Sequence, residues 1–275
     1  MADMADRVPA ELGAVQQTLF IPLAARARET GRKRPVLRDP KAVEVLAAVD
    51  FDTKKYGQGW GGQTTVLRTA IFDCWVSDFL TEHPGGTVVE IGTGLNSRFD
   101  RVGNDQAHWI DLDLPDTIEL RRRFFADSDR CQMVAASVLD EDWQPAVRDN
   151  PGPYFFVAEG VLVYLEQAPQ VIARIAREFP GALIAFDTYS QRMLLQQHRV
   201  AARKNMAARW AWSCDDPRTL ESLGLEIVRE AAVTRPPQEL RSRLPRPYRY
   251  ALPLVSRVVG DLATVTLFRA GSSQR

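Results

Sequence analysis

The chain has 275 residues, enough for one large α/β domain or for a core domain with a substantial cap. Apolar residues make up 45% of the sequence and charged residues 25%, which is ordinary for a globular protein that folds in water. The 35 Lys and Arg residues equal the 35 Asp and Glu residues, and this zero net charge argues against a general nucleic-acid binder, which would carry a basic excess.

The first part of the chain is predicted to be helical, and we expect residues 1–83 to form a cap. The helices are predicted over residues 11–30, with a break near Pro22, over 39–50 and over 64–83. Asp39 and Pro40 suit the N-cap and the first position of the second helix. A glycine-rich link, YGQGWGG (56–62), is expected to join the second helix to the third.

After residue 83 the pattern changes to strands that alternate with helices. Strands are predicted over 87–92, 107–113, 131–137, 153–160 and 181–189, with helices over 115–127 and 168–179. This alternation is typical of a parallel sheet covered by helices on both faces. The sequence therefore predicts an α/β core with a Rossmann-like sheet over residues 84–275.

The last third is predicted to add an insertion and two strands to this sheet. Residues 190–222 are interpreted as a helical insertion, and strands are expected over 224–233 and 261–270. Between these strands the Arg- and Pro-rich segment 235–250 is interpreted as a surface connection. The final strand is expected to enter the otherwise parallel sheet in antiparallel orientation.

The cysteines and the apolar runs bear on the environment of the protein. Cys74, Cys131 and Cys214 are scattered and lack metal-ligand spacing, so we expect neither a disulfide framework nor a metal site, and a reducing cytoplasm fits. No run resembles a signal peptide or reaches the roughly 18 apolar residues of a transmembrane helix, so no membrane association is expected.

A short acid- and glycine-containing stretch follows the first predicted strand. VVEIGTGLNSRFDR (88–101) places Glu90 near the end of the strand and Gly92 and Gly94 just after it. Ligands of open α/β sheets bind at the carboxyl ends of the strands, where glycines let backbone and ligand approach closely. The third glycine of a dinucleotide-binding G-x-G-x-x-G is missing, and a tight turn without a ligand is the alternative.

Acidic residues also end two other predicted strands. Asp111 and Asp113, about 20 residues beyond the glycines, are placed to accept hydrogen bonds from ribose hydroxyls, although Asp113 could instead cap the helix that begins at Pro115. Glu159 ends the apolar strand FFVAE and needs a cationic ligand or side chain as a partner, because a buried unpaired carboxylate is costly. A ribose, an adenine and cationic groups without a phosphate point to S-adenosyl-L-methionine.

Several motifs together resemble the leucine carboxyl methyltransferase family of class I methyltransferases, in particular its bacterial branch of tetracenomycin-type polyketide-synthesis O-methyltransferases. They cover residues 18–190 in the family's order: TLFIPLAARARET, LRDPKAVEVL, VLRTAIFD, VVEIGTGLNSRF, HWIDLDLPDTIELRRRFF, AASVLDEDW, FVAEGVLVYL and FPGALIAFDTY. Because these motifs recur at matching spacings, the resemblance is far more specific than the glycine loop alone.

The resemblance implies a site for S-adenosyl-L-methionine. It places Arg68 at the methionine carboxylate, Glu159 at the amino group, Asp113 with Asp111 nearby at the ribose, and Ser137 and Val138 beside adenine. The complete set of expected cofactor-binding residues is Arg68, Glu90, Gly92, Gly94, Asp111, Asp113, Leu114, Ser137, Val138 and Glu159. Asn96 stands where common members carry an acid, and the alternative for Arg68 is a surface or structural arginine on an amphipathic helix that pairs with Asp73 or a neighbour.

The acceptor determines what catalysis requires. A carboxylate is already ionised at pH 7, whereas a phenol, with a pKa near 10, would benefit from a general base. The candidate catalytic residues are Tyr164, which could instead merely pack, and His198, which could instead be a solvated helix histidine. An aromatic surface for a flat polyketide could come from Phe20, Tyr56, Trp60, Tyr189, Trp210 and Trp212, for each of which core packing is the alternative.

The leading hypothesis is an S-adenosyl-L-methionine-dependent O-methyltransferase that acts on a carboxylate or hydroxyl of a small natural product such as an aromatic polyketide. Alternatives are a protein C-terminal carboxyl methyltransferase and a non-catalytic protein that binds the same cofactor. A nicotinamide-dependent oxidoreductase is disfavoured by the missing third glycine. No nucleic-acid partner is expected, and a homodimer is left open.

Overall fold

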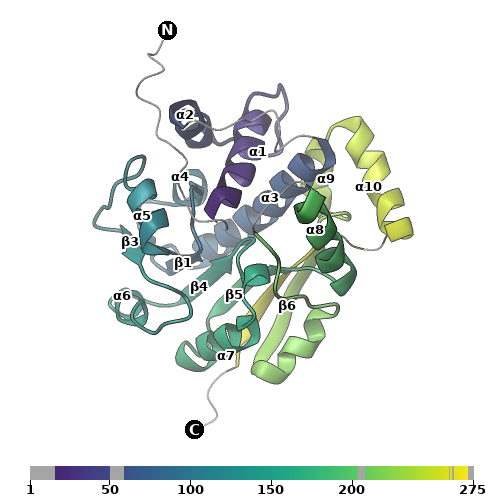
Figure 1. The fold of residues 1–275 in the computed structure, drawn as a ribbon. Helices are drawn as coiled ribbons and strands as arrows, with labels where there is room; N and C mark the ends of the chain where they lie inside the picture. The colour runs from purple at the N-terminus through teal and green to yellow at the C-terminus, as the bar shows by residue number, and fades with distance from the viewer. Residues whose placement is uncertain (1–15, 50–58, 204–207, 260, 262, 272–275) are drawn as a thin grey trace.

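A computed structural model describes residues 16–49, 59–203, 208–259, 261 and 263–271 (Figure 1). Within these residues the strands form one seven-stranded sheet with the order β3-β2-β1-β4-β5-β7-β6. The strands are β1 (Thr87–Ile91), β2 (His108–Asp113), β3 (Cys131–Ala135), β4 (Tyr154–Ala158), β5 (Leu183–Thr188), β6 (Leu225–Ala232) and β7 (Thr264–Ala270). β1 to β5 run parallel, whereas β7 is antiparallel to both β5 and β6, which confirms the expected α/β sheet and its antiparallel C-terminal strand.

Helices cover the sheet and extend beyond its edge (Figure 1). They are α1 (Phe20–Thr30), α2 (Pro40–Ala48), α3 (Gly59–Glu82), α4 (Arg98–Val102), α5 (Pro115–Arg121), α6 (Gln144–Arg148), α7 (Ala168–Glu178), α8 (Gln191–Arg203), α9 (Gln238–Arg243) and α10 (Arg246–Val259). Short 3-10 helices are η2 (Gln16–Leu19), η3 (Leu162–Tyr164) and η4 (Pro217–Leu223). In the described part of the chain, none of the helices combines the length and apolar character needed to cross a membrane.

The alternation of side chains along the strands divides the core into two layers. On β4, Phe155 and Val157 face the layer that contains α3, whereas Phe156 and Ala158 face the layer that contains α7. All four are buried because β4 lies in the middle of the sheet and helices cover both faces. A third apolar cluster joins α1 and α2 to the glycine loop through Leu95.

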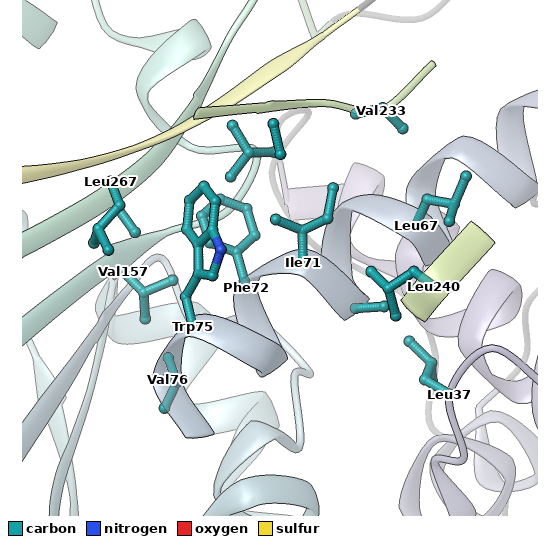
Figure 2. Close-up of a cluster of buried hydrophobic side chains, with 14 of the residues drawn as sticks. Leu37, Leu67, Ile71, Phe72, Trp75, Val76, Val157, Val233, Leu240 and Leu267 are labelled. Carbon is teal, nitrogen blue, oxygen red and sulfur yellow. The ribbon is translucent and has the colours of Figure 1, made fainter. Parts of the chain in front are cut away.

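Helix α3 packs directly onto the sheet. Figure 2 shows Phe72 and Trp75 of α3 beside Val157 of β4 and Leu267 of β7, with Leu240 of α9 on the outer side. The expected boundary placed α3 in a cap over residues 1–83 and the sheet in a core from residue 84. The side chains of α3 nevertheless share one apolar cluster with β4 and β7. This packing also fixes the long helix whose other residues reach the carboxyl ends of the strands.

The start of α2 follows the prediction. Asp39 caps the helix by accepting a hydrogen bond from the Ala42 backbone N–H (2.8 Å), and Pro40 occupies the first position. The break expected near Pro22 falls earlier, between η2 and α1. Pro22 does not interrupt α1, because it lies in the first turn, where a backbone N–H would have no intrahelical acceptor.

Two sequence interpretations were wrong. The glycine-rich link was expected to extend to residue 62, but α3 begins at Gly59. In the described part of the insertion over 190–222, α8 and η4 are helical, whereas residues 208–216 between them lie outside helices and strands. The expected surface connection over 235–250 is mostly exposed, and it contains α9 and the first turns of α10.

Candidate active site

A cavity of about 640 Å³ lies at the carboxyl ends of β1, β2 and β4. The strand order reverses between β1 and β4, and this switch point is where open α/β sheets hold their ligands. Most residues predicted from the sequence line it: Arg68, Glu90, Gly92, Gly94, Asp113, Leu114, Ser137, Val138, Glu159 and Tyr164. Asp111 and His198 do not line the cavity.

The glycine loop has a conformation that suits glycine. Gly92 has φ +63°, and a Cβ there would lie 2.4 Å from Cγ2 of Val161. Gly94 has φ +51°, and its backbone N–H donates a hydrogen bond to Oδ2 of Asp113 (2.7 Å). The fold itself therefore excludes a side chain at Gly92, while Gly94 ties the loop to the end of β2.

Two buried arginines hold the carbonyl groups of this loop. Arg121 donates hydrogen bonds from Nη1 to the carbonyl oxygens of Gly94 (3.0 Å) and Asn96 (2.6 Å), and Arg26 donates from Nη2 to that of Leu95 (2.8 Å). The carbonyl oxygens of three consecutive loop residues therefore have hydrogen-bond partners within the protein, and these bonds fix the backbone of the loop. The loop is therefore positioned before any ligand arrives.

Asp111 and Asp113 have different roles although both come from β2. Asp111 pairs with Arg121 (2.7 Å) and accepts a hydrogen bond from the Thr93 hydroxyl (2.8 Å), so its carboxylate is used inside the fold. Asp113 lines the cavity and accepts the backbone N–H groups of Gly94 and Leu114, which leaves acceptor capacity on its oxygens. Burial raises the pKa of Asp113 against the opposing effect of these two N–H groups.

The alternative in which Asp113 caps the following helix is wrong. The N-cap of α5 is Leu114, and no side chain caps the first turn. The Asp113 carboxylate instead accepts the N–H of Leu114, which lies before the helix. Its role is therefore at the cavity rather than in helix initiation.

Arg68 crosses from α3 to the ends of β4 and β5. Its Nε donates to Oε1 of Glu159 (3.2 Å), and its Nη1 donates to Oδ2 of Asp187 (2.9 Å) and to the Tyr189 hydroxyl (2.7 Å). Asp73, the partner named under the alternative, pairs instead with Arg98 and Arg101, so the ion pairs of Arg68 lie across the fold and not on its own helix. A Cβ on Gly160 would lie 3.0 Å from Nη1 of Arg68, so the glycine leaves room for the guanidinium.

Arg98 is the central cation of the site and was missed from the sequence. Its side chain is 0% exposed, and it pairs with Asp73 (2.8 Å), Glu90 (2.5 Å) and Glu159 (2.5 Å). Asn96, which replaces the acid of common family members, donates its side-chain amide to Glu90 (2.5 Å). Burial raises the pKa of Glu90 although Arg98 opposes the shift. Glu90 and Glu159 both end buried strands and both need a cationic partner, and this need is the sequence signal for an arginine such as Arg98.

These contacts form one ion-pair network that runs from α1 and α2 to β5. Within the described residues it joins four guanidinium groups and five carboxylates: Arg26, Arg68, Arg98 and Arg101 with Asp39, Asp73, Glu90, Glu159 and Asp187. The network therefore carries one acid in excess before protonation is considered. It also connects α1 and α2 with the cavity wall.

Glu159→Gln should reduce the acid sensitivity of the fold. Burial alone would raise the pKa of Glu159, but Arg68, Arg98 and the Thr69 hydroxyl lower it to about 2. A carboxylate with a lowered folded pKa contributes stability above its unfolded pKa, near 4.5, and this stability is lost as the pH falls toward the folded value. Between pH 6 and pH 3 the native protein should lose about 2 kcal/mol more free energy of unfolding than the variant.

Urea unfolding at both pH values measures this difference. Glu166→Gln, at an exposed position, serves as the matched control and should follow the native protein. Equal losses for the native protein and Glu159→Gln would contradict the assignment of a strongly lowered pKa.

The far wall of the cavity is mainly apolar. Leu114, which is 42% exposed, and Val138 lie there with Ser137, whose Oγ accepts the backbone N–H of Leu139 (3.1 Å). The Ser137 hydroxyl hydrogen thus stays available as a donor. An apolar wall with one neutral donor suits a flat heteroaromatic ring.

The two candidate catalytic residues occupy different places. Tyr164 lines the cavity from η3, and its hydroxyl makes no hydrogen bond to the described residues. His198 lies on α8, and its Nε2 is 2.7 Å from the carbonyl oxygen of Trp210. Since a carbonyl oxygen only accepts, Nε2 carries the hydrogen of this bond and does not present a lone pair to the cavity.

Three of the six aromatic residues singled out from the sequence line the cavity, namely Trp60, Tyr189 and Trp210. Phe20 is 1% exposed in the apolar cluster of α1 and α2, and Trp212 packs near Phe186 with ring centroids 6.4 Å apart. Tyr56 lies outside the described residues.

The sequence profile of the leucine carboxyl methyltransferase family matches residues 20–176, which is more than half of the chain. The chain belongs to this family. The match spans α1 to α7 and thus contains Arg68, the glycine loop, Asp113 and Glu159. The protein is an S-adenosyl-L-methionine-dependent methyltransferase.

Curated relatives agree with this assignment. The chain is 35% identical to the tetracenomycin polyketide synthesis O-methyltransferase TcmP of Streptomyces glaucescens, over 77% of this chain and 79% of that protein. It is 25% identical to the S-adenosyl-L-methionine-dependent methyltransferase dpfgK of Gibberella zeae, over 79% of this chain and 81% of the relative.

Solved structures support the fold. A putative methyltransferase from Thermobifida fusca superposes with a TM-score of 0.55 at 18% identity, covering 92% of this chain and 95% of that one. A duf574 family protein from Streptomyces avermitilis gives a TM-score of 0.56 at 16% identity, with coverages of 90% and 96%. At these identities the likeness concerns the class I methyltransferase fold alone.

Proposed function

We propose that this family member transfers a methyl group to a carboxylate of a small aromatic natural product of the polyketide type. The observation that carries the proposal is the composition of the cavity. The cavity is lined by the Asp113 carboxylate at the end of β2, the Arg68 guanidinium and the Tyr189 hydroxyl. None of its described lining residues is a histidine. The 35% identity to the tetracenomycin enzyme supports this choice of acceptor class.

The residues present fit S-adenosyl-L-methionine, which supplies an electrophilic methyl group on a sulfonium and leaves as a neutral thioether. Asp113 would accept the ribose hydroxyls with the capacity that Gly94 and Leu114 leave on its oxygens. Ser137 and Val138 would lie beside adenine on the apolar wall.

The methionine part would lie near Arg68 and Glu159. Glu159 accepts three hydrogen bonds, from Arg68, Thr69 and Arg98, and a carboxylate has about four acceptor positions, so one remains for an ammonium group. Among the described residues, Nη2 of Arg68 has no hydrogen-bond partner and is therefore available to a carboxylate. Glu159 stays ionised because its pKa is lowered, and its negative charge attracts an ammonium group.

The acceptor chemistry follows from the groups around Arg68. Burial and the neighbouring Asp187 carboxylate raise the pKa of Tyr189, so its hydroxyl stays protonated at neutral pH and cannot act as a base. A carboxylate acceptor needs no proton removal, and Arg68 would help to hold it in line with the methyl group. A hydroxyl acceptor is the alternative; it would benefit from a general base, and no histidine stands among the described residues that line the cavity.

The product of the labelled methyl transfer should be an ester. Mild alkaline treatment of the isolated product should then release labelled methanol, because a methyl ester hydrolyses where an aryl methyl ether does not. A panel of aromatic acids and matched phenols, each incubated with methyl-labelled cofactor, makes the comparison. Label retained after alkali would assign a hydroxyl acceptor, and transfer to the phenols alone would refute the carboxylate proposal.

A further inference from the structure

Trp210 lies in a segment outside helices and strands, and two other elements form hydrogen bonds with the backbone of this segment. The backbone N–H groups of Ala211 and Trp212 both donate to the carbonyl oxygen of Val163 (2.7 and 3.1 Å) in η3. On the other side, the backbone of Trp210 itself is bound by Gln197 and His198, which are consecutive residues of α8. The segment therefore links α8 to the loop that follows β4.

The two α8 side chains satisfy both backbone polar groups of Trp210. Oε1 of Gln197 accepts its N–H (3.3 Å), and Nε2 of His198 donates to its carbonyl oxygen (2.7 Å). Nε2 of Gln197 also donates to the carbonyl oxygen of Ala208 (3.1 Å). Both backbone polar groups of Trp210 are thus hydrogen-bonded although the residue lies outside regular secondary structure.

The indole that results faces Tyr189. The two ring centroids are 4.3 Å apart with the planes tilted by 45°, and both residues line the cavity. Tyr189 in turn accepts a hydrogen bond from Arg68 (2.7 Å). An aromatic surface formed by Tyr189 and Trp210, here called the acceptor wall, therefore adjoins the guanidinium that would hold the reacting group.

We propose that Gln197 and His198 are positioning residues that set acceptor specificity by holding Trp210 against Tyr189. This inference rests on the proposed function and assigns His198 to positioning rather than to base catalysis. The bond from His198 to Trp210 persists in the neutral Nε2–H form and in the protonated form, because each keeps a hydrogen on Nε2. A planar acceptor gains from stacking on the acceptor wall, whereas a saturated one does not.

The test uses anthraquinone-2-carboxylate as a planar probe and cyclohexanecarboxylate as a saturated one, titrated calorimetrically into the full-length protein with and without S-adenosylhomocysteine. Trp210→Leu should weaken binding of the planar probe by about 10-fold. His198→Leu, which removes the donor, should weaken it by about 5-fold, and His198→Gln, which retains a donor, should stay within about 2-fold of the native protein. Arg199→Gln, on the exposed side of α8, is the control.

The outcomes separate this inference from the proposed function. S-adenosylhomocysteine should bind all variants alike, and its failure to bind the native protein would count against the cofactor assignment and not against the acceptor wall. Equal affinity of the native protein for the two probes, or equal weakening by His198→Leu and His198→Gln, would overturn the inference. With any accepted aromatic acid as substrate, His198→Gln should keep kcat, whereas a general base would lose about 100-fold or more.

Discussion

Arg98→Met should destabilise the fold by about 3–5 kcal/mol, the largest effect we expect from one substitution. The guanidinium of Arg98 is fully buried and contacts Asp73, Glu90 and Glu159. Removing it leaves carboxylates inside the protein with less compensation, and this desolvation cost outweighs the apolar contacts that methionine adds. Urea unfolding at pH 7 measures the change.

A second substitution tests whether charge is the cause. Adding Glu90→Gln to Arg98→Met removes one of the carboxylates that lost its partner. The double variant should therefore lose less free energy of unfolding than the sum of the losses of the two single variants. Arg192→Met, at an exposed position of α8, should stay within about 0.5 kcal/mol of the native protein. A loss below about 1 kcal/mol for Arg98→Met would show that the network contributes little.

Asp113→Ala should raise the dissociation constant for S-adenosyl-L-methionine by about 100-fold. Hydrogen bonds to a charged group contribute about 1.5–3 kcal/mol each, and the carboxylate has capacity for ribose hydroxyls beyond its bonds to Gly94 and Leu114. Calorimetric titration measures the affinity, and Asp129→Ala, at an exposed position, is the control.

The same titration with S-adenosylhomocysteine distinguishes two explanations. If Asp113 acts on the ribose, both ligands share the contact, and the two losses should agree within about 3-fold. A loss confined to S-adenosyl-L-methionine would indicate attraction to the sulfonium charge instead. Unchanged affinity for both ligands would remove Asp113 from the site.

Local pattern predicted the acids of the site but not their partners. Glu90, Asp113 and Glu159 each stand at the end of an apolar run, and the parallel order of the strands brings such ends to one edge. The contacts of Arg68 span 91 residues to Glu159 and 119 to Asp187, and such separations depend on how α3 packs across the sheet. Asp111 has the same local pattern as Asp113, but its carboxylate forms an ion pair with Arg121 inside the fold, with Nη2 of Arg121 2.7 Å from Oδ2 of Asp111.

The errors in the C-terminal third have similar causes. Residues 208–216 lie outside helices and strands, and the N–H groups of Trp210, Ala211 and Trp212 find acceptors on α8 and η3, which the local sequence does not reveal. The Arg- and Pro-rich segment was expected only to be a surface connection, and its helices were not predicted; Pro237 precedes α9 and Pro247 lies in the first turn of α10, where helices tolerate proline. Pro253 lies inside α10, where proline removes a helical hydrogen bond.

The position of β7 has a consequence for biosynthesis. β6 is made before β7 but joins the sheet through it, since β7 lies between β5 and β6. Until the ribosome releases Thr264–Ala270, β5 presents an unpaired edge, and β6 has no neighbour in the sheet. A nascent or prematurely terminated chain that lacks these seven residues therefore exposes unpaired backbone N–H and C=O groups at the edges of β5 and β6, which favours aggregation.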